Sequence, residues 1–261
     1  MEEIRAVFLD IDNTMTSEKD GRLVESCRLA CRLLSKKGIA VVIATGRQGL
    51  CVPCVQDGLV FPDYIMGGNG ATLYDKDGRV IYSEHLERDV YEQVNAFCLE
   101  HDIDVFWKFA DNMYAYPGHS QLAAECDAEL KHFIIGLHPD PAELPGAGGL
   151  VNVPERELEM FQRQFSGRIS CVNGGYYIHD LNSLHTDKGT GLLKLAQLLG
   201  VSPEQCAAFG DSENDIPMLK AAGLGVAMGN AMDSAKGAAD YITDRASEDG
   251  VYKALKKFGI L

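Results

Sequence analysis

The fold is decided by the stretch IRAVFLDIDNT, residues 4–14. Residues 4–9 are mostly apolar, with β-branched and aromatic side chains, and carboxylates follow at Asp10 and Asp12. Such a run is typical of a strand that is buried on both faces of a parallel sheet, with polar groups after its carboxyl end. It predicts an α/β fold whose functional groups gather at one edge of the sheet.

The segments that follow have the same rhythm. Apolar residues at helical spacing predict a helix over residues 26–37, closed by Gly38, and residues 39–44 form a second buried strand. Strand, helix and strand together are a βαβ unit. Residues 63–66 predict a third strand, and the Lys-Asp-Gly sequence at 76–78 predicts the turn of a hairpin.

The pattern changes near residue 84 and returns after residue 186. Between these points the βαβ rhythm is absent, which predicts a separate α+β domain. We therefore expect a Rossmann-like parallel-sheet core domain from residues 1–83 and 184–261, with residues 84–183 as an inserted domain. In the insert we expect helices at 90–100, 122–131 and 154–165, strands at 103–109, 113–116, 133–137, 168–172 and 176–181, and a Pro- and Gly-rich loop at 138–149. After it we expect helices at 187–199 and 214–222 and strands at 205–209, 225–228 and 241–242.

Composition narrows the function. The net charge of −14 argues against a nucleic-acid or anionic-membrane surface. No stretch reaches the roughly 20 apolar residues of a membrane helix, and the acidic start does not resemble a signal peptide, so we expect a cytoplasmic protein. The same charge would repel a phosphate substrate, so a phosphate site here needs a local cation or a helix N-terminus.

The chain has eight cysteines, which lie within apolar patterns. Buried free thiols are therefore expected. Cys51 and Cys54 have the spacing of a redox or zinc pair, but no second pair accompanies them. We interpret them as two packing thiols on a short helix.

Polar residues follow the predicted strands at several points. In an open parallel sheet, ligands bind beyond the carboxyl ends of the strands, so these clusters are expected to converge. The clusters are residues 10–14, 45–47, 67–70 and 210–215, together with Lys188 and Gly189 at a helix start.

Each cluster also has an ordinary structural interpretation. Asp10 and Asp12 suit a divalent metal, a nucleophile with an acid/base, or a solvated turn. Thr45, Gly46 and Arg47 suit a phosphate seat or a plain helix cap. Asn69, which lies between glycines, either caps a turn or contacts a ligand.

The later clusters offer similar alternatives. Lys188 either holds a phosphate oxygen or is a surface lysine. Asp211 could bind a metal jointly with Asp10, and Asp215 could orient Lys188 or a metal-bound water. Both aspartates equally suit the positive end of a helix.

Taken together and in order, these clusters resemble the four motifs of the haloacid dehalogenase (HAD) superfamily. The first is DIDNT at 10–14, the second TGR at 45–47, the third Lys188-Gly189, and the fourth GDSEND at 210–215. GNGA at 68–71 and the form of the fourth motif point to the Cof-type branch of sugar-phosphate phosphatases. That branch has a type IIB cap where residues 84–183 lie here. Asn13 departs from the family's usual Gly, but Asn tolerates left-handed backbone.

The resemblance implies a role for each residue. Asp10 would be the nucleophile that becomes an aspartyl phosphate, and Asp12 the acid/base. Mg²⁺ would be held by the Asp10 carboxylate, the Asp12 backbone carbonyl and Asp211, with support from Asp215; an all-oxygen site fits this ion. The phosphoryl group would be bound by Thr45, Gly46, Arg47, Asn69, Lys188 and Asn214.

The implied activity is hydrolysis of a small-molecule phosphate ester by a monomer or homodimer. A phosphomutase of the same superfamily is an alternative, in which a sugar bisphosphate is isomerised without release of phosphate. A phospho-receiver domain also uses an acidic pair, Thr and Lys, but such domains are about half this length. A catalytically silent, ligand-binding member is the remaining alternative. The cap has no recognisable substrate motif.

Overall fold

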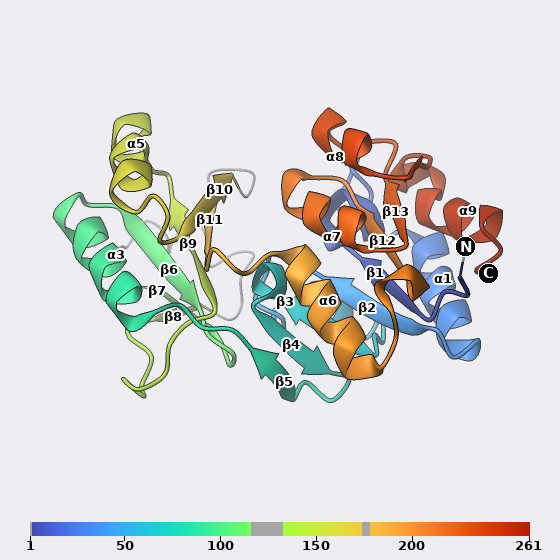
Figure 1. Ribbon diagram of the computed structural model, residues 1–261, viewed down its shortest axis with the longest axis horizontal. Coiled ribbons are helices and arrows are strands. Elements are labelled where there is room, and N and C mark those ends of the chain that lie inside the picture. Colours follow the sequence, from blue (N-terminus) through green and yellow to red (C-terminus); the bar gives the residue numbers. More distant parts are fainter. Residues whose placement is uncertain (1, 116–132, 174–177) are drawn as a thin grey trace.

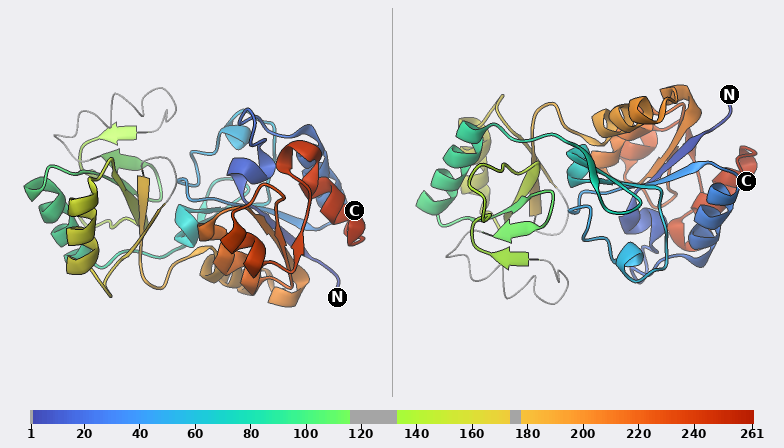
Figure 2. Two further views of the ribbon diagram at one scale, coloured as in Figure 1. Left: turned by 90° about the horizontal axis from the view of Figure 1, so that it is seen from above. Right: turned by 90° about the horizontal axis from the view of Figure 1, so that it is seen from below.

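A computed structural model describes residues 2–115, 133–173 and 178–261, and these form two parts (Figure 1). The core part contains both termini, and the cap part lies beside it as a separate layer of sheet and helices (Figure 2). The expected α/β core with an inserted cap is confirmed. The exact boundaries, at residues 83/84 and 183/184, stay a proposal.

Within the described residues, the core sheet has eight strands in the order β14-β13-β12-β1-β2-β3-β4-β5. The strands from β14 to β3 are parallel, and β4 and β5 add an antiparallel hairpin at one edge. β1 lies in the middle with all four residues buried, as its apolar run predicts. The strands are β1 (Ala6–Leu9), β2 (Ala40–Ala44), β3 (Tyr64–Gly67), β4 (Thr72–Asp75), β5 (Val80–Ser83), β12 (Cys206–Gly210), β13 (Leu224–Ala227) and β14 (Tyr241–Ile242).

Amphipathic helices pack against the core sheet. Cys27, Ala30 and Leu34 of α1 belong to the same apolar core as the strands, as do Leu192 and Leu195 of α6. α1 contacts α9, and α6 contacts α7. The core helices are α1 (Glu25–Lys36), α2 (Pro53–Gln56), α6 (Lys188–Leu199), α7 (Ile216–Ala221), α8 (Asp233–Ala238) and α9 (Gly250–Lys257).

The cap sheet has the order β10-β11-β9-β6-β7-β8 and is antiparallel except between β7 and β8. Among the described residues, the cap helices are α3 (Arg88–Glu100) and α5 (Glu155–Gln164), and both lie on the face away from the core (Figure 1). Trp107 packs on that face with Phe97 and Phe161. The strands are β6 (Asp104–Lys108), β7 (Met113–Ala115), β8 (Phe133–Ile135), β9 (Ala147–Val151), β10 (Ser170–Asn173) and β11 (Ile178–Asn182).

The loop expected at 138–149 is wrong at its end, because residues 147–149 belong to strand β9. A Cβ at Gly148 would come within 2.5 Å of the Trp107 ring, and one at Gly149 within 2.6 Å of the Phe106 ring. The glycines are therefore present because aromatic rings of β6 lie over them, and they do not mark a turn. The helix expected at 122–131, and the ends of two expected strands at 116 and at 176–177, lie outside the described residues.

Two expectations from composition concern the cysteines and membrane-spanning helices. The described cysteines are free thiols, and Cys51 and Cys54 are both buried. The expected short helix is wrong for Cys51, because α2 begins at Pro53 and contains only Cys54. Among the described residues, no helix is both long enough and apolar enough to cross a membrane.

Candidate active site

The site begins where β1 ends. Asp10 is buried, and its backbone N–H donates to the Phe209 carbonyl of β12, 3.0 Å away. The chain then turns through a short helical segment, Ile11–Met15, in which Asn13 has a φ of 61°. This left-handed conformation is one that Asn tolerates, as expected for the residue that stands in place of the family's Gly. The turn leads the chain away from the sheet edge and leaves Asp10 beside the neighbouring strand ends.

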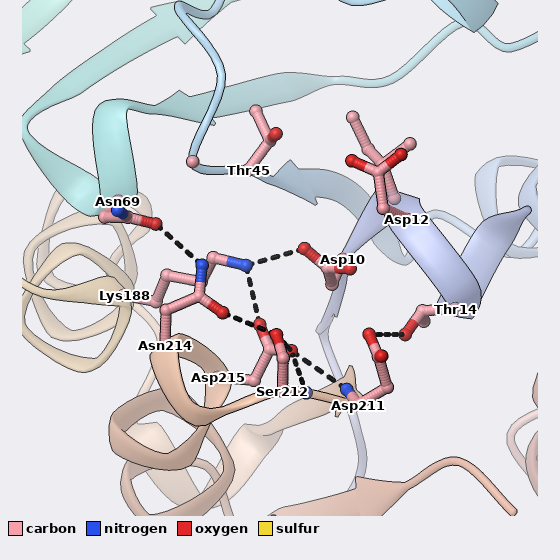
Figure 3. A network of polar contacts seen from close by, with 12 residues as sticks. Asp10, Asp12, Thr14, Thr45, Asn69, Lys188, Asp211, Ser212, Asn214 and Asp215 are labelled. Carbon is pink, nitrogen blue, oxygen red and sulfur yellow. Dashed lines mark hydrogen bonds and ion pairs between the residues drawn. The ribbon is translucent and has the colours of Figure 1, made fainter. Parts of the chain in front are cut away.

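Lys188 contacts Asp10 from the start of α6. Its Nζ lies 2.6 Å from Asp10 Oδ1 and 2.6 Å from Asp215 Oδ1, and the side chain is 0% exposed (Figure 3). The preceding Asp187 caps the helix by accepting from the Thr190 N–H. Burial lowers the pKa of Lys188, but the charges of Asp10 and Asp215 outweigh this and raise it. The surface-lysine interpretation is therefore wrong.

Asp211 completes an acidic cluster. One carboxylate oxygen each from Asp10, Asp211 and Asp215 lies within 4.8 Å of the others, and all three residues are buried. Burial first, and the Asp215 charge second, raise the pKa of Asp10 well above its usual value and that of Asp211 to about 7. Three carboxylates and one ammonium leave a local charge of −2.

This donor set fits a hard divalent cation. The cluster supplies oxygen ligands only, which is the preference of Mg²⁺. A bound dication would balance the residual charge of −2. The raised pKa values of Asp10 and Asp211 express first the cost of burying these carboxylates and second that of placing them beside Asp215.

Asp12 lies apart from this cluster. Its carboxylate accepts two hydrogen bonds from Arg47, Nε to Oδ2 at 3.2 Å and a terminal guanidinium nitrogen to Oδ1 at 3.0 Å. The Asp12 side chain is 58% exposed, and Figure 3 places it on the other side of Asp10 from Asp211. Arg47 contacts Asp12 in this structure, and its expected role at the phosphate stays a prediction.

Two loops close the remaining side of the site. Thr45 is buried after β2, and its Oγ1 accepts from the Arg47 N–H at 3.0 Å. The interpretation of Thr45 as a plain helix cap is wrong, because the next helix, α2, begins only at Pro53. Asn69 has a φ of 56°, and its N–H donates to the Thr45 carbonyl at 3.0 Å. Asn214 Nδ2 donates to Asn69 Oδ1 at 3.0 Å (Figure 3). The structure thus brings the predicted motifs to one edge of the sheet.

Three polar residues of the cap join this network, and the sequence reasoning missed them. Lys108 at the end of β6 pairs with Asp180 of β11, with Nζ and Oδ1 2.8 Å apart. Asn69 Nδ2 donates to Asp180 Oδ2 at 3.1 Å and to Asn182 Oδ1 at 3.3 Å. The sequence offered little signal for them, because Lys108 only follows an apolar run at 105–107 and Asp180 lies in a strand that also contains His179 and Asn182.

This fold and this site define an α/β enzyme that uses carboxylates and a buried lysine under a cap domain. The chain belongs to the haloacid dehalogenase-like hydrolases, whose family model matches residues 7–255. The resemblance seen in the motifs, and with it the expected class of phosphoric monoester hydrolase, is confirmed at the level of the family.

Relatives along the whole chain agree. The chain is 33% identical over 256 residues to a phosphoglycolate phosphatase of Methanopyrus kandleri, covering 96% of this chain and 95% of the relative. It is 29% identical over 257 residues to the 5-amino-6-(5-phospho-D-ribitylamino)uracil phosphatase YcsE of Bacillus subtilis, covering 97% and 95%. The solved structure of the HAD subclass IIB sugar phosphatase BT4131 superposes with a TM-score of 0.84 at 26% identity, covering 98% of this chain and 100% of the other.

Proposed function

We propose that this protein is a Mg²⁺-dependent phosphatase that hydrolyses a small phosphorylated metabolite, a sugar phosphate, through an aspartyl phosphate on Asp10. The observation that carries the proposal is the contact of the Asp10 carboxylate with buried Lys188, beside Asp211 and Asp215. A carboxylate nucleophile and a phosphate dianion repel each other, so a cationic group beside the carboxylate lowers the barrier to attack.

In this mechanism Asp10 attacks phosphorus, and the P–O bond to the alcohol breaks. Asp12 donates its proton to the departing alcohol oxygen and later accepts a proton from the water that attacks the aspartyl phosphate. Arg47 holds the Asp12 carboxylate beside the nucleophile until the substrate binds. Thr45, Gly46, Asn69, Asn214 and Lys188 bind and orient the phosphoryl oxygens.

The metal would be held by Asp10, the Asp12 backbone carbonyl and Asp211, with Asp215 in support. When bound, Mg²⁺ would supply positive charge that stabilises the negative charge on the phosphoryl oxygens during the transfer. Asp215 has a second task, because its Oδ2 accepts from the backbone N–H groups of Asp211 and Ser212, at 2.9 and 3.0 Å. It thereby fixes the loop that carries Asp211.

The test is the variant Asp10→Asn, assayed for phosphate release from p-nitrophenyl phosphate with Mg²⁺ supplied. Removal of a nucleophile is expected to lower the rate on the order of 10³-fold or more. The matched control is Asp77→Asn at the exposed hairpin tip, which should retain wild-type activity. Full activity in Asp10→Asn would contradict the mechanism, and activity that survives complete chelation of Mg²⁺ would contradict the metal dependence.

A further inference from the structure

The charged side chains that are buried in this protein lie in one place. Among the described residues they are Asp10, Lys108, Asp180, Lys188, Asp211 and Asp215. Four of them form the cluster around Asp10, and the other two are the pair contributed by the cap. Burial of an ion pair often costs more than its attraction returns, so the stability of the cap gives no reason for Lys108 and Asp180.

This cap pair lies on the sheet face that is turned toward the core. Along β6, Val105 and Trp107 pack toward the cap helices, whereas Phe106 packs on the opposite face with Met113 and with Cys51 of the core. Lys108 has the same parity as Phe106, and its Nζ lies 5.5 Å from the centre of the Phe106 ring. The pair therefore presents charged groups from a face that also carries the apolar Phe106 and Met113 and the polar Asn182.

The pair also touches the loop that would hold the phosphate. Lys108 Nζ donates to the Gly46 carbonyl at 2.7 Å. A Cβ at Gly46 would come within 3.4 Å of Asp180 Oδ2, so the carboxylate lies directly against that glycine. Through Asn69, Asp180 is also connected to Asn214. An alcohol that extends from the phosphorus toward the cap meets these groups.

We infer that Lys108 and Asp180 form the leaving-group subsite, and that their paired charges select a neutral, hydroxylated alcohol over one that carries a carboxylate. This inference rests on the proposed function and names residues that determine its specificity. Within the described chain, Lys108 directs two of its three ammonium donors at Gly46 and Asp180, which leaves the third for a ligand oxygen. Asp180 is an acceptor only, so the pair offers both halves of the hydrogen bonding that a hydroxyl needs.

A carboxylate fits this subsite poorly. Lys108 is already neutralised by Asp180 at 2.8 Å, and a second carboxylate would have to share that cation while facing the Asp180 charge. Both side chains are less than a tenth exposed, so water screens this repulsion weakly.

The experiment compares two substrates of equal chain length, glycerol 3-phosphate and 3-phosphoglycerate, whose leaving groups differ in a hydroxymethyl against a carboxylate. The measured quantity is the ratio of kcat/KM for the carboxylate substrate to that for the neutral one. Within one protein sample this ratio is independent of the fraction of active enzyme. The wild type is expected to prefer glycerol 3-phosphate by about tenfold, the effect of one unbalanced charge at close range.

Asp180→Asn leaves Lys108 without its counter-charge and should raise the ratio about tenfold. Lys108→Met leaves Asp180 alone and should lower it. The control is Asp89→Asn, which removes the carboxylate 2.6 Å from Arg168 on the helical side of the cap and should leave the ratio unchanged.

A ratio that stays within twofold of the wild type in both Asp180→Asn and Lys108→Met would overturn the inference. So would a wild type that hydrolyses p-nitrophenyl phosphate but neither ester, or one that prefers 3-phosphoglycerate. Absence of turnover on all three substrates would instead contradict the proposed phosphatase activity, and the inference would fall with it.

Discussion

Replacement of Lys188 by Met tests how the site is held together. The lysine is the one cation that the described contacts place between Asp10 and Asp215, each 2.6 Å from its Nζ. At an effective dielectric constant of 20, two unit charges about 4 Å apart attract by about 4 kcal/mol. The attraction from two such contacts is offset in part by the free-energy cost of removing the ammonium from water. Loss of one partner from a buried pair typically destabilises a protein by 3–5 kcal/mol, and we expect about 4 kcal/mol here.

The assay is urea unfolding at pH 7.5 without metal, followed by far-ultraviolet circular dichroism. Trp107, the single tryptophan, lies in the cap sheet, so its fluorescence reports separately on the cap. The control is Lys253→Met. Its ammonium is also 2.6 Å from a carboxylate, that of Asp244, but both side chains are 52% exposed. An exposed pair contributes about 1 kcal/mol or less, so the control should unfold almost as the wild type does.

Mg²⁺ should narrow the difference between Lys188→Met and the wild type, because a bound cation replaces part of the missing charge. The reasoning is refuted if Lys188→Met costs no more than Lys253→Met. A difference that Mg²⁺ leaves unchanged would contradict the metal ligands proposed at Asp10 and Asp211. The two results separate the role of the lysine from that of the metal.

Two further variants test the surroundings of the site. Burial raises the pKa of Glu18, but hydrogen bonds from Ser247 and Arg245 outweigh this and lower it from 4.5 to about 2. Glu18→Gln should therefore lower the free energy of unfolding by about 2 kcal/mol at pH 7, and this loss should shrink as the pH falls from about 4.5 toward 2. Urea titrations of both proteins at pH 7 and pH 3.5 measure it. A loss that is the same at both pH values would exclude the ionic contribution. Phe161→Ala in the cap core should cost about 3–5 kcal/mol and shift the urea midpoint followed by Trp107 fluorescence, and an unchanged midpoint would show that the cap core does not depend on this ring.

Much of the core followed from the sequence because its strands are buried on both faces. The apolar runs at 4–9 and 39–44 leave little choice of structure, and β1 and β2 occupy them. The strands of the cap were harder to predict from the sequence. β9 contains Gly148 and Gly149 because the Trp107 and Phe106 rings lie over them, and that contact exists only in the folded sheet.

The site, too, could be predicted from the sequence only in part. The rule that ligands bind at the carboxyl ends of parallel strands is enough to predict that Asp10 and Asp211 lie together. The pairing of Asp12 with Arg47 depends on side-chain conformation, which the motif spacing does not contain. Lys108 and Asp180 are 72 positions apart in the chain, so their contact could not be predicted from spacing.

The strongly acidic composition and an anionic substrate are compatible because the charge is arranged locally. The protein carries −14 overall, yet both lysines that are buried among the described residues, Lys108 and Lys188, lie in the network around Asp10. Screening by salt weakens distant surface charges over about 8–10 Å, whereas buried charges at contact distance are screened much less. A phosphate ester that reaches the site therefore meets the near cations more strongly than the remote carboxylates. The two buried lysines therefore supply at the site the positive charge that the overall composition lacks.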